Sequence, residues 1–243
     1  MQYSNAGNKT VGEIVATDFR TAKVFEKYSI DFCCGGKVPL TEICEKKGFD
    51  INTIVNELEA VQSEPAERSQ NYSAWALPFL IDYIVNTHHL YLKENDEQIA
   101  AYARKIADVH GGNHPEVINI TVVFDKIAAD LATHLIEEED VFFPAVKRVK
   151  AAMIAGLTPE TGDLELIRVS LIRLHSEHQE IGGAVHTIRH LSNNYAIPDD
   201  ACNTFMLTYR KLKEFEDDLH KHVHLENNIL FPKVTAIVSQ LPL

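Results

Sequence analysis

The sequence predicts an all-α protein, with a small N-terminal helical domain followed by a four-helix bundle. From Trp75 onward, apolar residues recur at steps of three and four, and no segment shows the alternation of period two that is typical of strands. Every histidine lies between His88 and His224, whereas three of the four cysteines lie in the first 70 residues. This division indicates two modules with different chemistry.

The N-terminal domain is expected over residues 1–61, as short helices on either side of the loop DFCCGGKVP. The glycines and proline of this loop prevent a continuous helix. Residues 62–73, QSEPAERSQNYS, are polar and contain a proline, and we interpret them as a linker. The bundle is then expected over residues 74–243.

The helices of the bundle follow from the apolar stripes and from the residues that interrupt them. Gly111 and Gly112 should end one helix, and Pro115 suits the first turn of the next. Pro232 should bend the last helix, because proline removes a hydrogen bond and crowds the preceding turn. The expected helices cover residues 75–93, 96–110, 115–149, 163–191 and 199–238. Long amphipathic helices with short connections favour a four-helix bundle.

Two segments of the bundle share one motif. Residues 134–144 read HLIEEEDVFFP and residues 222–232 read HVHLENNILFP. In each, a histidine is followed four residues later by a glutamate and then by Phe-Pro, and both side chains take positions on the apolar stripe of their helix. Of the acidic run in the first copy, only Glu138 should face inward. His178 takes a similar inward position on a third helix.

These inward residues predict a metal site. Burying an unpaired carboxylate costs on the order of several kcal/mol, and two buried carboxylates also repel each other. A cation removes both problems. The predicted ligands are His134, Glu138, His178, His222 and Glu226. Oxygen and imidazole ligands suit iron or manganese, and imidazole also suits zinc. Two carboxylates amid several histidines indicate two metals that the carboxylates bridge.

Composition and charge exclude several other functions. The net charge of −12 argues against binding to nucleic acid, which needs clustered Lys and Arg, and against an anionic membrane surface. No run approaches the roughly 20 apolar residues of a membrane span. The first residues lack the pattern of a signal peptide. We therefore expect a cytoplasmic protein.

The chain contains the segments VFEKYSIDFCCGG, LIDYIVNTHH, SEHQE and DDLHKHVHLENNILFP. In these segments it resembles the iron-sulfur cluster repair di-iron proteins, also called the repair-of-iron-centres family, whose bundle has the hemerythrin-like fold. It implies a non-haem centre of two iron ions, with five histidines and two bridging glutamates. At matching positions these residues are His89, His110, His134, Glu138, His178, His222 and Glu226.

Two of these positions come with separate evidence from periodicity. His110 ends a short stripe of Ile99, Ala103 and Ile106, which agrees with the resemblance. At the His88–His89 pair the two sources differ, because the stripe through Ile84 favours His88 whereas the family pattern favours His89.

The resemblance also implies that the adjacent Cys33 and Cys34 are functional, as a redox pair or a contact for a client protein. A disulfide between neighbouring cysteines is strained and is a poor structural link. The implied function is repair of iron-sulfur clusters damaged by nitrosative or oxidative stress, by supplying iron or by binding and reducing nitric oxide. The alternative is an oxygen or nitric oxide sensor or carrier of the hemerythrin type.

The expected partners follow from these functions. They are damaged iron-sulfur proteins, small ligands such as nitric oxide or dioxygen, and an electron donor that the sequence does not identify. A homodimer remains open. Nitric oxide reduction would make the protein an enzyme, whereas iron donation would not.

Overall fold

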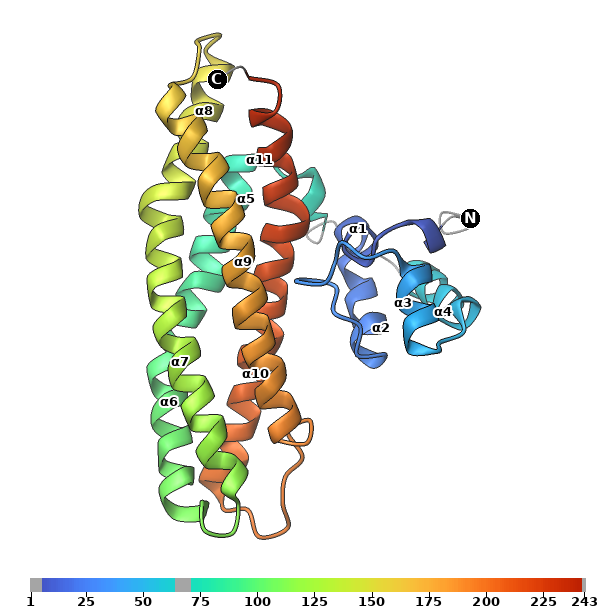
Figure 1. The fold of residues 1–243 in the computed structure, drawn as a ribbon, viewed down its shortest axis with the longest axis vertical. Helices are drawn as coiled ribbons and strands as arrows, with labels where there is room; N and C mark the ends of the chain where they lie inside the picture. The colour runs from blue at the N-terminus through green and yellow to red at the C-terminus, as the bar shows by residue number, and fades with distance from the viewer. Residues whose placement is uncertain (1–5, 64–70, 242–243) are drawn as a thin grey trace. The chain divides into compact units, whose positions relative to one another are not determined.

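The computed structural model describes residues 6–63 and 71–241, and within these ranges the chain is helical and contains no strand (Figure 1). The all-α fold class is therefore confirmed. Most of the expected linker, residues 64–70, lies outside the described residues. Contacts divide the chain into two compact units: Met1–Leu80 with Val223–Gln240, and Ile81–His222 with Leu241–Leu243. None of the helices in the described ranges combines the length and apolar character that a membrane span requires.

The first unit begins with short helices around a small apolar core. A capping box starts α1, because the Thr10 side chain accepts from Glu13 N–H while the Glu13 carboxylate accepts from Thr10 N–H. Gly48, in the left-handed conformation with φ 71°, ends α3. The helices are α1 (Val11–Thr17), α2 (Ala22–Lys27), α3 (Leu40–Lys47) and α4 (Ile51–Ser63). The fully buried side chains include Val11, Ile14, Phe25, Leu40, Ile54 and Leu58.

The loop between α2 and α3 is tied to the rest of this unit on two sides. The first N–H groups of α1 bond to it, from Val11 to the Val38 carbonyl (3.1 Å) and from Gly12 to the Gly36 carbonyl (2.8 Å). Asn228, in the C-terminal segment of the same unit, donates to the Phe32 carbonyl (2.9 Å). The approach is so close that a Cβ on Gly12 would lie 2.3 Å from the Asn228 Oδ1.

From Leu77 onward, the described chain forms long helical runs that continue through short π-helical turns. The α-helices are α5 (Leu77–Tyr83), α6 (Leu90–His110), α7 (Pro115–Glu137), α8 (Phe143–Ile154), α9 (Thr161–Leu191), α10 (Asn203–Leu225) and α11 (Phe231–Val238). The π turns are η5 (Ile84–His89), η6 (Glu138–Phe142) and η7 (Glu226–Leu230). In the second unit, α6 packs beside α7, and α7 beside α9 (Figure 1).

One of the expected boundaries is absent. Residues 75–93 and 96–110 were expected as separate helices, but the structure has a continuous run from Leu77 to His110. The polar pair Asn95 and Asp96 lies within α6, where Asn95 Nδ2 donates to the Tyr91 carbonyl, four residues earlier (2.8 Å). Polar residues on a helix surface do not end the helix by themselves.

The Phe-Pro end of the repeated motif coincides with two π turns. Phe143 N–H donates to the Glu138 carbonyl, and Phe231 N–H to the Glu226 carbonyl, in each case across five residues. The next residue in each copy is proline, which has no N–H to bond the carbonyl four residues back. The interruption expected near Pro232 is therefore a π turn, a rare element that is frequent at functional sites.

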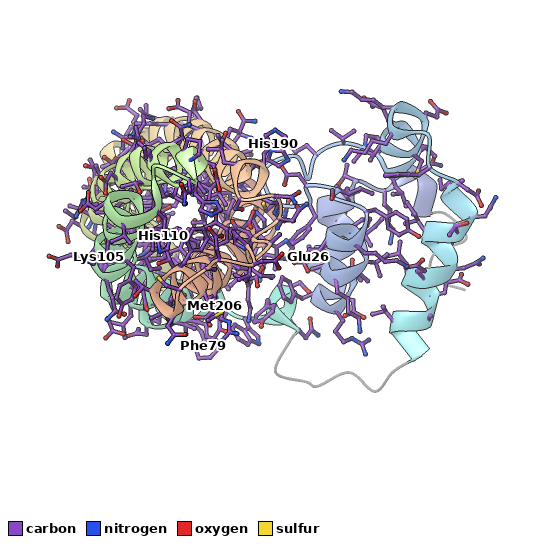
Figure 2. All side chains as sticks on the ribbon, turned by 90° about the horizontal axis from the view of Figure 1, so that it is seen from below. Glu26, Phe79, Lys105, His110, His190 and Met206 are labelled. Atoms are coloured by element: carbon purple, nitrogen blue, oxygen red, sulfur yellow. The ribbon has the colours of Figure 1, made fainter. Side chains whose placement is uncertain are left out.

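Apolar side chains of the second unit fill the space between its helices. Figure 2 looks along the bundle from the end at which His110 lies, and Lys105 on α6 points outward there. The buried side chains of this unit include Ile99, Ala103, Ile120, Phe124, Ile127, Leu131, Leu174, Ile181 and Phe215. Five histidines and two glutamates of this unit are also buried, and four of these histidines with one of the glutamates form most of the site described next.

Candidate metal centre

Six of the seven side chains that the sequence and the resemblance indicated as ligands come together. They form two groups of four residues. Within each group, one nitrogen or oxygen atom from every side chain lies within 4.8 Å of the others. One group is His89, Glu138, His222 and Glu226, and the other is His134, Glu138, His178 and Glu226. Glu138 and Glu226 belong to both groups. All six side chains are buried, and the two glutamates are 0% exposed.

The spacing of the histidine nitrogens fits a metal ion in each group. The Nε2 atoms of His89 and His222 are 3.0 Å apart, and so are those of His134 and His178. Adjacent donors of an octahedron with bonds of about 2.1 Å to nitrogen are also about 3.0 Å apart. Oε2 of Glu138 lies 3.4 Å from Nε2 of both His89 and His134, so it stands between the two groups.

The burial of Glu138 and Glu226 also indicates metal ions in this cluster. Two fully buried glutamates that share their surroundings repel each other and lose hydration. Two divalent cations between them would reverse this cost. Buried histidine and glutamate clusters that share Glu138 and Glu226 are consistent with a carboxylate-bridged di-iron centre.

Two carboxylates outside the cluster orient its histidines. His89 Nδ1 donates to Glu139 (2.8 Å), and His134 Nδ1 donates to Glu177 (2.7 Å). A carboxylate only accepts here, so each bond keeps the proton on Nδ1 and turns the Nε2 lone pair toward the cluster. The hydrogen bond from His89, reinforced by Lys93, lowers the pKa of Glu139 to about 2, and the bond from His134 lowers the pKa of Glu177.

Sequence reasoning missed both of these carboxylates. The pattern predicts Glu139 on the solvated side of its helix, yet its side chain is only 23% exposed and contacts His89. Glu177 directly precedes His178 and was not singled out. A glutamate beside a predicted ligand on the same helix was the only available signal.

The structure brings His89, rather than His88, to the cluster. The turn η5 explains why the apolar stripe favoured His88: a π-helical turn carries one more residue than an α-helical turn, and Ile84 is five residues before His89. His88 is also buried, but its Nδ1 bonds to Asp218 at 2.9 Å and its ring faces Tyr83.

The structure does not bring His110 to the other six residues. His110 lies at the C-terminal end of α6, 21 residues after His89, which corresponds to roughly 30 Å along a helix. Its Nε2 is 3.1 Å from the Cys202 sulfur, and its ring packs edge-on against Phe205. The cluster therefore contains four histidines, rather than the five that the resemblance implied.

The cysteine pair lies in the loop between α2 and α3, and neither residue forms a disulfide. The sulfurs of Cys33 and Cys34 are 4.0 Å apart. Asp31 accepts hydrogen bonds from the backbone N–H groups of both cysteines. The bond to Cys34 and burial raise the pKa of the Cys33 thiol well above its usual value.

Comparisons with known families match both parts of the chain. The family model described as "Hemerythrin HHE cation binding domain" matches residues 80–234, and the model described as "Domain of Unknown function (DUF542)" matches residues 7–62.

Proteins with similar sequences match over most of their own length. A "Probable iron-sulfur cluster repair protein" of Haemophilus influenzae is 35% identical over 213 residues, which cover 87% of this chain and 90% of that protein. "Iron-sulfur cluster repair protein ScdA" of Staphylococcus haemolyticus is 31% identical over 92% of this chain and 96% of its own. "Iron-sulfur cluster repair protein YtfE" of Yersinia pseudotuberculosis is 29% identical over 93% and 96%.

Proposed function

Because the chain belongs to the iron-sulfur cluster repair protein family, we propose that it restores damaged iron-sulfur clusters by supplying iron from a di-iron centre in its hemerythrin-like bundle. Repair makes iron-sulfur proteins its clients. Residues 1–61 would form the cysteine-containing module and residues 74–243 the di-iron module, a division that the matched ranges 7–62 and 80–234 support.

The proposed ligands divide evenly between two irons. His89 and His222 would hold one ion, His134 and His178 the other, and Glu138 and Glu226 would bridge them. Each ion then receives two nitrogens and two carboxylate oxygens from the protein. Non-haem iron held by two histidines and a carboxylate commonly keeps positions for small ligands, and this donor set would allow the same.

The small donor set, two histidines with two shared glutamates for each ion, is the observation that best supports iron supply. An ion held by four protein donors can exchange its remaining ligands and be passed on more easily than one that the protein encloses. When bound, the iron pair supplies redox chemistry and affinity for small ligands. The chain's own residues hold and orient: Glu139 and Glu177 fix the proton on Nδ1 of His89 and His134, so that the opposite nitrogen remains a donor.

An isotope-transfer experiment tests iron supply. The protein would be loaded anaerobically with isotopically labelled iron and mixed with an iron-sulfur protein damaged by nitric oxide, and label in the rebuilt cluster would be measured by mass spectrometry. We expect the client to regain its cluster with labelled iron. A cluster rebuilt only with unlabelled iron would show instead that the protein removes nitric oxide.

Variants of the bridging residues give the matched comparison. Glu138→Ala or Glu226→Ala should lower iron to well below two ions per chain and abolish label transfer, because each substitution removes a bridge. Glu137→Ala is the control, since Glu137 lies next to Glu138 but pairs with Arg173. Glu137→Ala should retain both iron and transfer.

A further inference from the structure

A second group of possible metal ligands lies in the first unit, outside the bundle cluster. Asp31, Cys33 and Cys34 each present one donor atom, and these atoms lie within 4.8 Å of one another. Among the described residues, this is the group that contains thiols. The bundle cluster uses nitrogen and oxygen donors, so the two groups differ in chemistry.

The Asp31 carboxylate organises this loop. Its Oδ1 accepts from the N–H groups of Cys33 (2.9 Å) and Cys34 (3.0 Å), and its Oδ2 accepts from Gly35 N–H (2.8 Å). The Cys33 sulfur donates to the same Oδ1 at 3.2 Å. Both thiols are thereby held on the side of the loop where the carboxylate lies.

The backbone of the loop is fixed from the outside as well. Asn228 Nδ2 donates to the Phe32 carbonyl (2.9 Å), and Asn227 Nδ2 donates to the Cys33 carbonyl (3.3 Å). A Cβ on Gly36 would lie 2.4 Å from the Phe32 carbonyl oxygen, so only glycine allows this path of the chain. The donor atoms are therefore positioned before any ligand arrives, which reduces the entropy lost on binding.

We propose that Asp31, Cys33 and Cys34 form a transient binding site for a divalent cation that accepts sulfur ligands, with ferrous iron as its cargo. Thiolates favour such ions over magnesium or calcium. Binding breaks the two S–H bonds, forms two sulfur–metal bonds and releases both protons to solvent, so no oxidant is needed.

The same charges that disfavour a free thiolate favour a bound cation. Asp31 lies beside both sulfurs, and a second negative charge there would be repelled. A divalent ion neutralises the charges of Asp31 and of the two sulfurs that would otherwise oppose ionisation.

The exposure of the three ligands suits loading and release. Cys33 is 5% exposed, Cys34 is half-buried and Asp31 is exposed, so one side of the site is open to solvent. Three protein donors leave at least one position of a tetrahedral ion to another molecule. The role of this site as a stopping point for iron rests on the proposed function, but its metal binding does not.

Cobalt(II) titration of the full chain under anaerobic conditions tests the site. Cobalt bound to thiolate gives an intense near-ultraviolet charge-transfer absorption, whereas cobalt in the nitrogen and oxygen cluster of the bundle does not. We expect this absorption in the wild-type protein and its loss in Cys33→Ser with Cys34→Ser. Asp31→Asn keeps an oxygen for the N–H groups of Cys33 and Cys34 but loses the acceptor of Gly35 N–H and the charge. It should weaken cobalt binding about tenfold or more.

Cys202→Ser is the matched control, because it removes an exposed thiol elsewhere and should leave the absorption unchanged. Should Asp31→Asn fail to fold, Cys34→Ser alone takes its place, and it should weaken cobalt binding and lower the absorption. The proposal is overturned if the wild-type protein lacks the absorption, or if the charge at Asp31 has no effect on cobalt affinity. Label transfer to a damaged client is measured separately, so failure of this site is distinguishable from failure of repair.

Discussion

Cys202 precedes α10, and its sulfur receives stabilisation from two directions. Backbone N–H of Phe205, at the start of the helix, and the His110 ring both lower the pKa of this thiol, with the backbone bond the larger cause. A lower pKa places more of the sulfur in the thiolate form at neutral pH, and the thiolate is the nucleophile. We predict that Cys202 reacts with iodoacetamide faster than Cys33, Cys34 or Cys44, as measured by mass spectrometry of labelled peptides.

His110→Asn should slow this labelling several-fold, because it removes the ring that faces the sulfur at 3.1 Å. His114→Asn is the control, since His114 bonds to Glu116 and Asp200 rather than to the cysteine. Equal rates for Cys202 in the wild-type protein and in His110→Asn would contradict the assignment.

At the scale of elements, the π turns tie helix geometry to metal binding. Pro144→Ala restores an N–H that can bond to the Asp140 carbonyl, which would convert η6 to α-helix and turn Glu138 away from its present direction. We predict roughly tenfold weaker iron binding with a free energy of unfolding for the iron-free protein that is unchanged or slightly higher. Iron content after dialysis and a denaturant titration measure the two quantities.

Pro115→Ala is the matched control, because Pro115 begins α7 and has no π turn before it. The Pro115→Ala variant should bind iron as tightly as the wild-type protein does. If Pro144→Ala also binds iron normally, the π turn is a consequence of the proline alone and does not serve the site.

A glycine sets the packing of α1. Gly12→Ala would place a Cβ 2.3 Å from Asn228 Oδ1 and 2.9 Å from the Gly36 carbonyl oxygen, so the loop must move. We predict a loss of about 1–3 kcal/mol in the free energy of unfolding, measured with guanidinium chloride. Gly183→Ala, on α9 with no atom within 4 Å of the added Cβ, should be neutral or stabilising by up to about 1 kcal/mol.

Helix periodicity was sufficient to predict the bundle and five of the clustered residues, because the stripe identifies the inward face. Periodicity could not choose between His88 and His89, since the π turn before them adds a residue to the repeat. It also could not exclude His110, because a stripe gives the face of a helix but not the height along it. Periodicity also did not identify Glu139, because it does not show how far a side chain at the border of the inward face can reach. The Glu139 carboxylate contacts His89 on another helical segment.

At the scale of the whole molecule, metal binding should contribute to stability. The iron-free bundle keeps two fully buried carboxylates and four buried histidines together, which disfavours folding. With free iron at about 100 times its dissociation constant, linkage alone adds roughly 3 kcal/mol and raises the melting temperature by about 5–10 °C. We predict this difference between iron-loaded and chelator-treated protein in a calorimetric scan, and equal melting temperatures would contradict a site formed only in the folded state.

The composition of the first unit has a consequence for the order of events during synthesis. The described residues before Ile81 pack with residues 223–240, so they cannot complete that packing until the end of the chain has been translated. At roughly 5–20 residues per second, the ribosome needs about 7–30 s to add the intervening part. Throughout this interval the loop of Cys33 and Cys34 lacks the hydrogen bonds from Asn227 and Asn228. The loop that carries Cys33 and Cys34 therefore reaches its final conformation only after the C-terminal segment has left the ribosome.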